Sequence, residues 1–324
     1  KLKNGLFEFI KKIKESDNYK NQKRKITAGK FDRDKQIIFS NEIFEKLGLK
    51  SNFSRIDLSE HPFTTTLGLH DVRITTNVRD DVLFSIGSTI HETGHALYEL
   101  GISNKEQYTV LGNAPSLGLH ESQSRFWENM IGLNKNFWKY FFPMFRKLSG
   151  VEDNLDLWHK EINQVYPSLI RIESDEVYYC LHIILRYEIE KGLIDGTIEV
   201  DDLENLWNEK IKKYFDLSVK NPKEGFMQDV HWSEGYFGYF PTYALGTIYA
   251  TQIYNKLNEE IKDIENNISN GNFDILINWL KEKIHKIGSK KMAEDIIKDV
   301  CGKGLSEEEF LEYLNDKYKK IYDL

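Results

Sequence analysis

The sequence contains little cysteine and little proline. Its two cysteines, Cys180 and Cys301, stand far apart in segments with helical patterns, which argues against a disulfide framework and against a cysteine-based zinc site. This use of cysteine favours the cytoplasm, a reducing compartment. Six prolines among 324 residues favour a mainly helical protein, and the chain is long enough to bury a large core.

Long apolar runs and a surplus of basic residues are also missing. No run is long enough to span a bilayer, and the first residues lack the apolar core of a signal peptide. A net charge of −7 without a basic stripe argues against nucleic-acid binding. Residues 1–16 form an amphipathic pattern, and we expect this helix to dock on the core rather than on a membrane.

Apolar residues recur at helical spacing along most of the chain. We expect helices at residues 1–16, 33–48, 82–101, 119–132, 152–164, 168–191, 199–218, 244–267, 273–287, 289–300 and 306–322. The aromatic-rich residues 134–149 are interpreted as core or interface, and residues 225–243 as an ordered loop. Residues 52–78 predict two or three short strands with a glycine turn, including Phe63–Leu69 and Val72–Val78.

The most informative stretch is Val82–Gly101, which contains His91-Glu92-Thr93-Gly94-His95. On a helix the two histidines share one face, so both imidazoles can bind one metal ion, while Glu92 can take a proton from a metal-bound water. Gly94 weakens the helix by about 1 kcal/mol against alanine, but a small residue there lets another backbone come close. The alternative interpretation is two histidines that stand four apart by chance.

A catalytic zinc site needs a third protein ligand. Glu121 follows His95 by 26 positions, which is room for a loop and a second, antiparallel helix, and His120 is the rival candidate. Carboxylates should hold the histidine rings in place. The candidates for that role are Asp71, Asp175 and Asp229.

Several segments together resemble the M32 family of metallocarboxypeptidases, the thermostable carboxypeptidase Taq type. They are His61-Pro62-Phe63, Asp71-Val72-Arg73-Ile74-Thr75, the His91–His95 motif, His120-Glu121-Ser122-Gln123, Ile170-Arg171-Ile172-Glu173-Ser174-Asp175 and Gly225-Phe226-Met227-Gln228-Asp229-Val230-His231-Trp232. The resemblance implies a mainly α, helical metallopeptidase fold with a small sheet beside the HExxH helix and a deep substrate groove. It also implies a homodimer and a further helical region before Lys1, so we expect residues 1–324 to form a single catalytic domain shortened at its N-terminus.

The resemblance further implies one divalent metal ion per chain, held by His91, His95 and Glu121, with Glu92 as general base. Zinc is expected, with cobalt as the alternative. The implied activity is removal of the last residue from peptides with a free C-terminus, with broad specificity.

Substrate recognition is expected to use an arginine, because its planar fork suits a carboxylate. The expected substrate-binding residues are Arg171 first, Arg73 second, and also Tyr243 and His61. His231 is the candidate donor to the oxyanion, with Tyr243 or Tyr239 behind it. The ordinary alternatives are a structural salt bridge for Arg171 and a hydrogen-bonded core histidine for His231.

Three other functions remain open at this point. A metalloendopeptidase or oligopeptidase would use the same metal helix but would not need a free carboxylate on its substrate. A catalytically impaired fragment would bind metal and peptide without turnover. A purely structural helical protein would bind no stoichiometric metal.

Overall fold

The computed structural model describes residues 1–27, 29–68 and 70–324, and these form two compact units. The first unit consists of residues 1–22, 163–245 and 307–324, and the second of residues 23–162 and 246–306. The chain therefore passes between the units more than once. The single catalytic domain that we expect over residues 1–324 stays a prediction.

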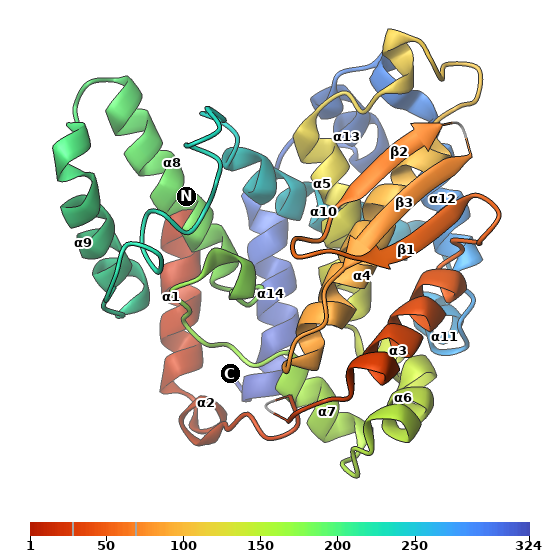
Figure 1. The fold of residues 1–324 in the computed structure, drawn as a ribbon, viewed down its shortest axis with the longest axis horizontal. Helices are drawn as coiled ribbons and strands as arrows, with labels where there is room; N and C mark the ends of the chain where they lie inside the picture. Colours follow the sequence, from red (N-terminus) through yellow and green to blue (C-terminus); the bar gives the residue numbers. More distant parts are fainter. Residues whose placement is uncertain (28, 69) are drawn as a thin grey trace. The chain divides into compact units, whose positions relative to one another are not determined.

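A small sheet packs on the motif helix in the second unit. Strand β3 (Asp71–Thr76) lies in the middle, with β1 (Ser54–Leu58) parallel to it and β2 (Thr64–Gly68) antiparallel. Val72, Ile74 and Thr76 of β3 are buried, and the strand packs against α4 (Val82–Gly101), which lies beside the sheet in Figure 1. This confirms the predicted strands and their place beside the helix, although Leu69 lies outside the described residues.

The rest of the second unit is helical around an aromatic core. Asp81 caps α4 by accepting a hydrogen bond from the Leu83 N–H at 2.9 Å. The further helices are α3 (Arg33–Lys46), η1 (Val110–Gly112), α5 (Leu117–Arg125), the π-helix η2 (Phe126–Gly132), α6 (Lys135–Ser149), α7 (Leu155–Ile162), α11 (Ile264–Ser269), α12 (Asp274–Lys283), η5 (His285–Lys290) and α13 (Ala293–Cys301). Helix α6 buries Phe137, Trp138 and Phe145, which supports the interpretation of residues 134–149 as core.

The first unit is built from helices that are distant in sequence. They are α1 (Leu2–Glu15), α2 (Asp17–Asn21), η3 (Arg171–Glu173), α8 (Tyr179–Ile194), η4 (Val200–Asp202), α9 (Leu203–Phe215) and α14 (Glu307–Tyr322). Helix α10 (Pro241–Glu260) begins in this unit and continues in the second. Helix α1 buries Leu6, Ile10 and Ile13 and packs against α8 and α14, so the amphipathic N-terminal helix docks on the core as expected.

Several predicted helices are shorter in the structure, and two of them differ for a visible reason. The helix predicted over residues 168–191 begins only at Tyr179, because the Asp175 carboxylate accepts hydrogen bonds from the backbone of Tyr166, Val177 and Tyr178. These side-chain bonds replace helical ones, a competition that an apolar pattern does not report. The helix predicted over residues 244–267 ends at Glu260, and Asp263 has a left-handed conformation with φ 58°.

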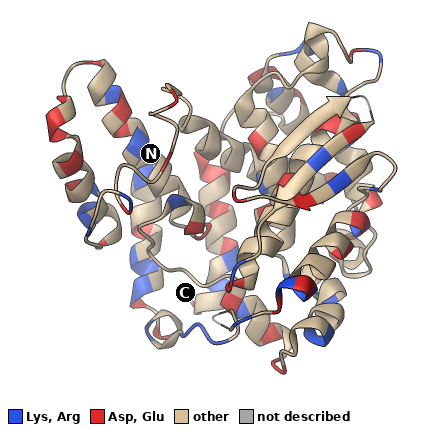
Figure 2. Ribbon diagram, in the orientation of Figure 1, with Lys and Arg blue, Asp and Glu red and all other residues tan. Residues whose placement is uncertain are grey.

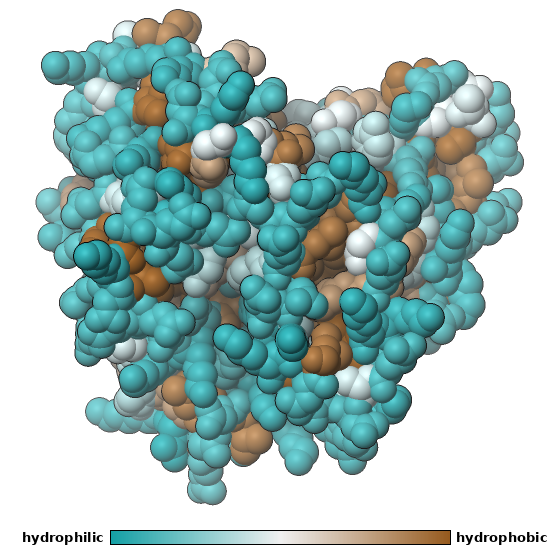
Figure 3. All heavy atoms as spheres, turned by 180° about the vertical axis from the view of Figure 1, so that it is seen from behind, coloured by the Kyte–Doolittle hydropathy of each residue, from teal (hydrophilic) through white to brown (hydrophobic). Residues whose placement is uncertain are grey.

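Acidic and basic residues occur together on many of the helices (Figure 2). The face in Figure 3 is mostly hydrophilic, with hydrophobic side chains in scattered groups. None of the helices within residues 1–27, 29–68 and 70–324 has both the length and the apolar character needed to cross a membrane.

The buried carboxylate of Glu161 holds the segment before α3 in the second unit. Its Oε1 accepts the backbone N–H groups of Lys25, Ile26 and Thr27 at 3.1, 2.7 and 2.6 Å. The hydroxyl of Thr27 donates to the same oxygen at 3.0 Å. One side chain therefore satisfies a run of backbone donors that would otherwise lack a partner.

We expect Glu161→Ala to lower the free energy of unfolding by about 2–3 kcal/mol, because it leaves the buried N–H groups of Ile26 and Thr27 without this acceptor. Urea denaturation followed by circular dichroism measures the change. The control is Lys160→Ala, at the exposed neighbouring position of α7, which should change stability by less than about 0.5 kcal/mol. Equal stability of the two variants would contradict the role of Glu161.

Candidate metal centre

The site begins with an unusually close approach of two helices. A Cβ added to Gly94 on α4 would lie 2.6 Å from the carbonyl oxygen of Gln123 and 2.7 Å from Cα of Ser124. On the opposite side, a Cβ added to Gly246 of α10 would lie 2.5 Å from Cγ of Glu121. The two glycines thus make room for α5 and for the Glu121 side chain, as we expect of a small residue at position 94.

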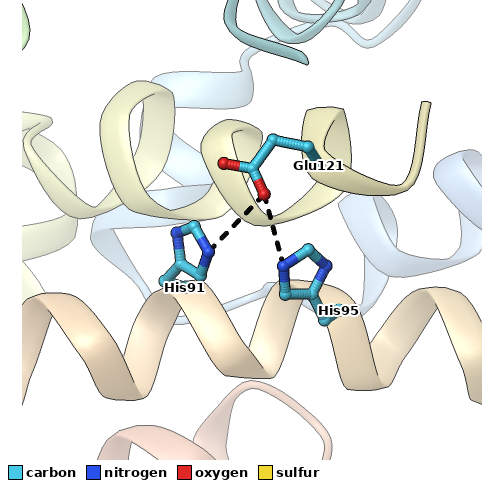
Figure 4. A group of neighbouring side chains, drawn as sticks. All are labelled: His91, His95 and Glu121. Carbon is cyan, nitrogen blue, oxygen red and sulfur yellow. Dashed lines mark ion pairs between the residues drawn. The ribbon is translucent and has the colours of Figure 1, made fainter. Parts of the chain in front are cut away.

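Three side chains converge across this contact (Figure 4). Oε2 of Glu121 lies 3.7 Å from Nε2 of His91 and 3.4 Å from Nε2 of His95. One ligand atom from each residue lies within 4.8 Å of the others, and the described residues contain no other such group. Tetrahedral zinc with ligand bonds of about 2.0–2.2 Å separates its ligand atoms by roughly 3.3–3.6 Å. The three residues fit a divalent metal ion.

The electrostatics of the site favour positive charge. Burial opposes protonation of His91, but Glu121 and Glu128 outweigh it and raise the pKa of His91 to about 9. Burial also opposes ionisation of Glu121, yet His91, His95 and Arg125 hold the pKa of this carboxyl well below its usual range. Burial lowers the pKa of His95 despite its bond to Glu121, so its imidazole is neutral. A cation among these groups is therefore stabilised.

A carboxylate orients one of the candidate ligand histidines. Oε2 of Glu128 lies 2.8 Å from Nδ1 of His91, which leaves Nε2 of the ring for the metal. Arg125 joins the two carboxylates, with its Nε 3.1 Å from Glu121 and its Nη1 3.2 Å from Glu128. Glu128 follows Glu121 by seven residues on the same run of helix, and this two-turn spacing is the signal by which the sequence could have identified it.

The three aspartates proposed for this role have other partners. Asp71 forms a bidentate pair with Arg73, Asp175 accepts backbone N–H groups of Val177 and Tyr178, and Asp229 pairs with two arginines of the first unit. The prediction that these aspartates hold the histidine rings is therefore corrected in favour of Glu128. Their short side chains lie next to backbone or arginine partners that the sequence does not reveal.

Glu92 is buried beside His91 on α4 and is held from the sheet. The hydroxyl of Thr64, on β2, donates to Oε2 of Glu92 at 2.6 Å. The sheet therefore contributes to the site, because this hydrogen bond from β2 limits the rotamers of the Glu92 carboxylate. Thr64 carries no sequence signal, since its partner lies 28 positions away on another element.

His120, the alternative to Glu121 as third ligand, is bound to a carboxylate of α4. Its Nε2 lies 2.9 Å from Oε1 of Glu99, and its ring stacks on His95 with centroids 4.5 Å apart. A nitrogen bound to a carboxylate is not directed at a metal. Of the two open candidates, the geometry favours Glu121 as the third ligand.

The remaining predicted site residues fall into two groups. In the second unit, Arg73 is exposed on β3 and paired with Asp71, and His61 lies exposed in the loop before β2. In the first unit, Nε2 of His231 lies 3.0 Å from the Tyr243 hydroxyl, and the guanidinium of Arg171 lies 4.8 Å from the centre of the Tyr243 ring.

Burial and the nearby Arg171 lower the pKa of His231 to about 4, so this histidine is neutral at pH 7. The ring of Tyr239 also lies beside it, with centroids 5.2 Å apart. The structure thus brings Arg171, His231, Tyr239 and Tyr243 together within one unit.

Comparison with known proteins agrees with this geometry. Residues 1–318 match the family described as carboxypeptidase Taq (M32) metallopeptidase. The chain belongs to this M32 family. It is 41% identical, over 99% of its length, to carboxypeptidase 1 of Bacillus subtilis, and 42% identical, over 88%, to thermostable carboxypeptidase 1 of Thermus thermophilus.

Solved M32 structures share its fold. An M32 carboxypeptidase from Deinococcus radiodurans superposes with a TM-score of 0.93 at 33% identity, covering 100% of this chain and 65% of that one. Metallocarboxypeptidase 1 of Trypanosoma cruzi gives 0.91 at 34% identity, covering 98% and 66%. The chain spans 64% of the Bacillus relative and 56% of the Thermus relative. Membership of this metallopeptidase family implies a divalent metal, and the predicted mainly helical fold is confirmed.

The glycine contact between the helices should control metal affinity. We expect Gly94→Ala to weaken zinc binding by at least about tenfold, because the new methyl group pushes α5 and its Glu121 away from the histidines. Competition with a chromophoric chelator measures the affinity. Gly87→Ala on the same helix is the control, since its Cβ would meet nothing closer than 3.9 Å. Similar zinc affinities of the two variants would count against this view of the helix contact.

Glu128 should influence the metal through His91. We expect Glu128→Gln to reduce zinc affinity about 10–100-fold, because the imidazole loses its charged partner. The matched control is Glu99→Gln, which removes the same charge from the partner of His120 and should leave zinc affinity within about threefold of wild type. If Glu99→Gln reduced zinc affinity as much as Glu128→Gln does, His120 would be favoured over Glu121 as the third ligand.

Proposed function

We propose that this chain acts as a metal-dependent carboxypeptidase with broad specificity, removing the last residue of peptides by hydrolysis. The observation that carries the proposal is the group of His91, His95 and Glu121 with the buried Glu92 beside it. The M32 relatives named above are themselves called carboxypeptidases. The chain covers only part of their length, so its own activity is part of the proposal.

A divalent ion held by these ligands supplies Lewis acidity towards water and the scissile carbonyl. We propose zinc for this ion, with cobalt as the alternative, because two imidazoles and one carboxylate suit both. Glu92, oriented by Thr64, accepts a proton from the attacking water and delivers it to the leaving amine. Because the Thr64 hydroxyl fixes the Glu92 carboxylate, little reorganisation is needed for either proton transfer.

The first unit supplies the proposed recognition groups. His231, which is neutral and hydrogen-bonded to Tyr243, is proposed to donate to the carbonyl oxygen as negative charge develops on it. Arg171 is proposed to bind the free carboxylate of the substrate, with Arg73 as the second candidate and His61 as a further contact. Arg171 is preferred because it belongs to a cluster of buried charges, whereas Arg73 is exposed and paired with Asp71.

Assembly and compartment are proposed from the family resemblance and the sequence. We propose a homodimer in the cytoplasm, acting on peptides with a free C-terminus. Gel filtration with light scattering tests the dimer. The predicted deep groove stays a prediction.

Glu92→Gln should separate metal binding from hydrolysis. The variant should retain stoichiometric metal and lose about 10²–10⁴-fold in kcat, because the amide cannot accept the proton. Metal analysis and release of free amino acids from a blocked peptide measure the two properties. Glu152→Gln, at an exposed position, is the control. Cleavage by Glu92→Gln at the wild-type rate would overturn the mechanism.

The wild-type protein should also distinguish peptides by their C-terminus. A peptide with a free carboxylate should be cleaved and the same peptide with an amidated terminus should not. Equal cleavage of both would favour an endopeptidase or oligopeptidase. Bound metal without cleavage of either would favour a metal- and peptide-binding fragment.

A further inference from the structure

Two buried arginines of the first unit share one carboxylate. Oδ1 of Asp229 accepts from Nε and Nη2 of Arg171 at 3.0 and 2.8 Å. Oδ2 of the same residue lies 2.7 and 2.6 Å from Nε and Nη2 of Arg186. Arg171 is 7% exposed and Arg186 is fully buried. The carboxylate is thus held between two guanidinium groups.

This cluster carries a surplus positive charge. Burial lowers the pKa of Arg186 to about 10 despite Asp229, so the group remains protonated at neutral pH. Burial opposes ionisation of Asp229, but Arg186 and Arg171 lower its pKa to about 2. Two cations therefore face one anion in a buried place. A buried surplus charge is unfavourable unless a counter-ion joins it, so the cluster is suited to an anion.

The two arginines are not equivalent. The guanidinium of Arg186 is enclosed, with its carbon 4.8 Å from the centre of the Trp207 ring and 5.4 Å from that of Phe240. Its Nη1 donates to the carbonyl oxygen of His182 at 3.0 Å. No atom of this side chain is exposed to a ligand in solution, because the residue has 0% relative accessibility.

Arg171 keeps donors for a ligand. A guanidinium has five N–H groups, and Asp229 and the Tyr179 hydroxyl take three of them among the described residues. One N–H remains on each terminal nitrogen, which matches the two oxygens of a carboxylate. The Tyr243 ring on which Arg171 lies limits its movement.

We propose that Arg186 is a positioning residue for recognition of the substrate's terminal carboxylate. It binds the far oxygen of Asp229, so that Asp229 orients Arg171 without neutralising its charge. This inference rests on the proposed carboxypeptidase function and adds to it the reason why Arg171 can be paired with an aspartate and still bind an anion. Without Arg186, Asp229 and Arg171 would form a neutral pair.

Binding can be measured without turnover in the Glu92→Gln background. The probes are one N-acetylated tripeptide with a free C-terminal carboxylate and the same tripeptide as its amide, titrated by calorimetry in the zinc-loaded protein. Glu92→Gln should bind the acid at least about tenfold more tightly than the amide. Adding Arg186→Gln should weaken binding of the acid about tenfold and leave binding of the amide within about twofold.

Restoring the charge should restore the preference. Arg186→Lys in the same background should bind the acid within about threefold of the unmodified background, because an ammonium group can still pair with Asp229. The matched control is Lys210→Gln on α9. It removes a cation that lies 2.6 Å from Glu188, a residue of α8 like Arg186. This control should change neither affinity, and thermal melting and zinc content verify that each variant is folded.

Several results would overturn the inference. Equal weakening of acid and amide by Arg186→Gln would show that Arg186 only supports the fold, and an unchanged acid affinity would show no effect on recognition. If Arg186→Gln failed to fold, loss of the acid preference in folded Arg186→Lys would refute the charge-based role and its retention would support it. No preference for the acid in the Glu92→Gln background would instead refute carboxylate recognition itself, and with it the proposed function.

Discussion

The contact between α4 and α5 is the constraint on which the metal centre depends. Gly94 stands between the two histidines of the motif, and its missing side chain allows the backbone of Gln123 and Ser124 to approach within the space of a methyl group. Only at this separation can a glutamate on α5 bring its oxygen 3.4 Å from Nε2 of His95. A glycine that weakens an isolated helix is therefore required by the packing of the pair.

Buried charge is arranged in the same way in the two units but with opposite sign. In the second unit Arg125 lies between Glu121 and Glu128, so the acids outnumber the arginine and a metal cation is favoured. In the first unit Asp229 lies between Arg171 and Arg186, so the cations are in surplus and an anion is favoured. Each cluster orients its side chains by internal ion pairs and leaves one charge for a ligand. A metal ion and a peptide carboxylate are the ligands that these charges suit.

Several features could be predicted because they depend on residues close together in the chain. Helix α4 has in the structure the bounds Val82–Gly101 that we predict, since the helical spacing of its apolar residues is a local feature. The start of α8, predicted at residue 168 and observed at Tyr179, could not be predicted in this way. An apolar pattern continues through residues 168–178. The Asp175 carboxylate, however, accepts backbone N–H groups of Tyr166 before it and Val177 after it, and these bonds prevent a helix there.

The sequence by itself determined the HExxH helix, its two histidines, the neighbouring glutamate and the family motifs, because each is a matter of residue type and short spacing. Only the tertiary structure favours Glu121 over His120 as the candidate third ligand, and it alone shows the contacts of Glu128 and Thr64 and the sharing of Asp229 between Arg171 and Arg186. These choices depend on which side chains meet across packed elements, and Thr64 and Glu92 meet at a separation of 28 positions. The spacing of apolar residues predicts on which face of a helix or strand a residue lies. Packing and buried charge determine which side chain it contacts there.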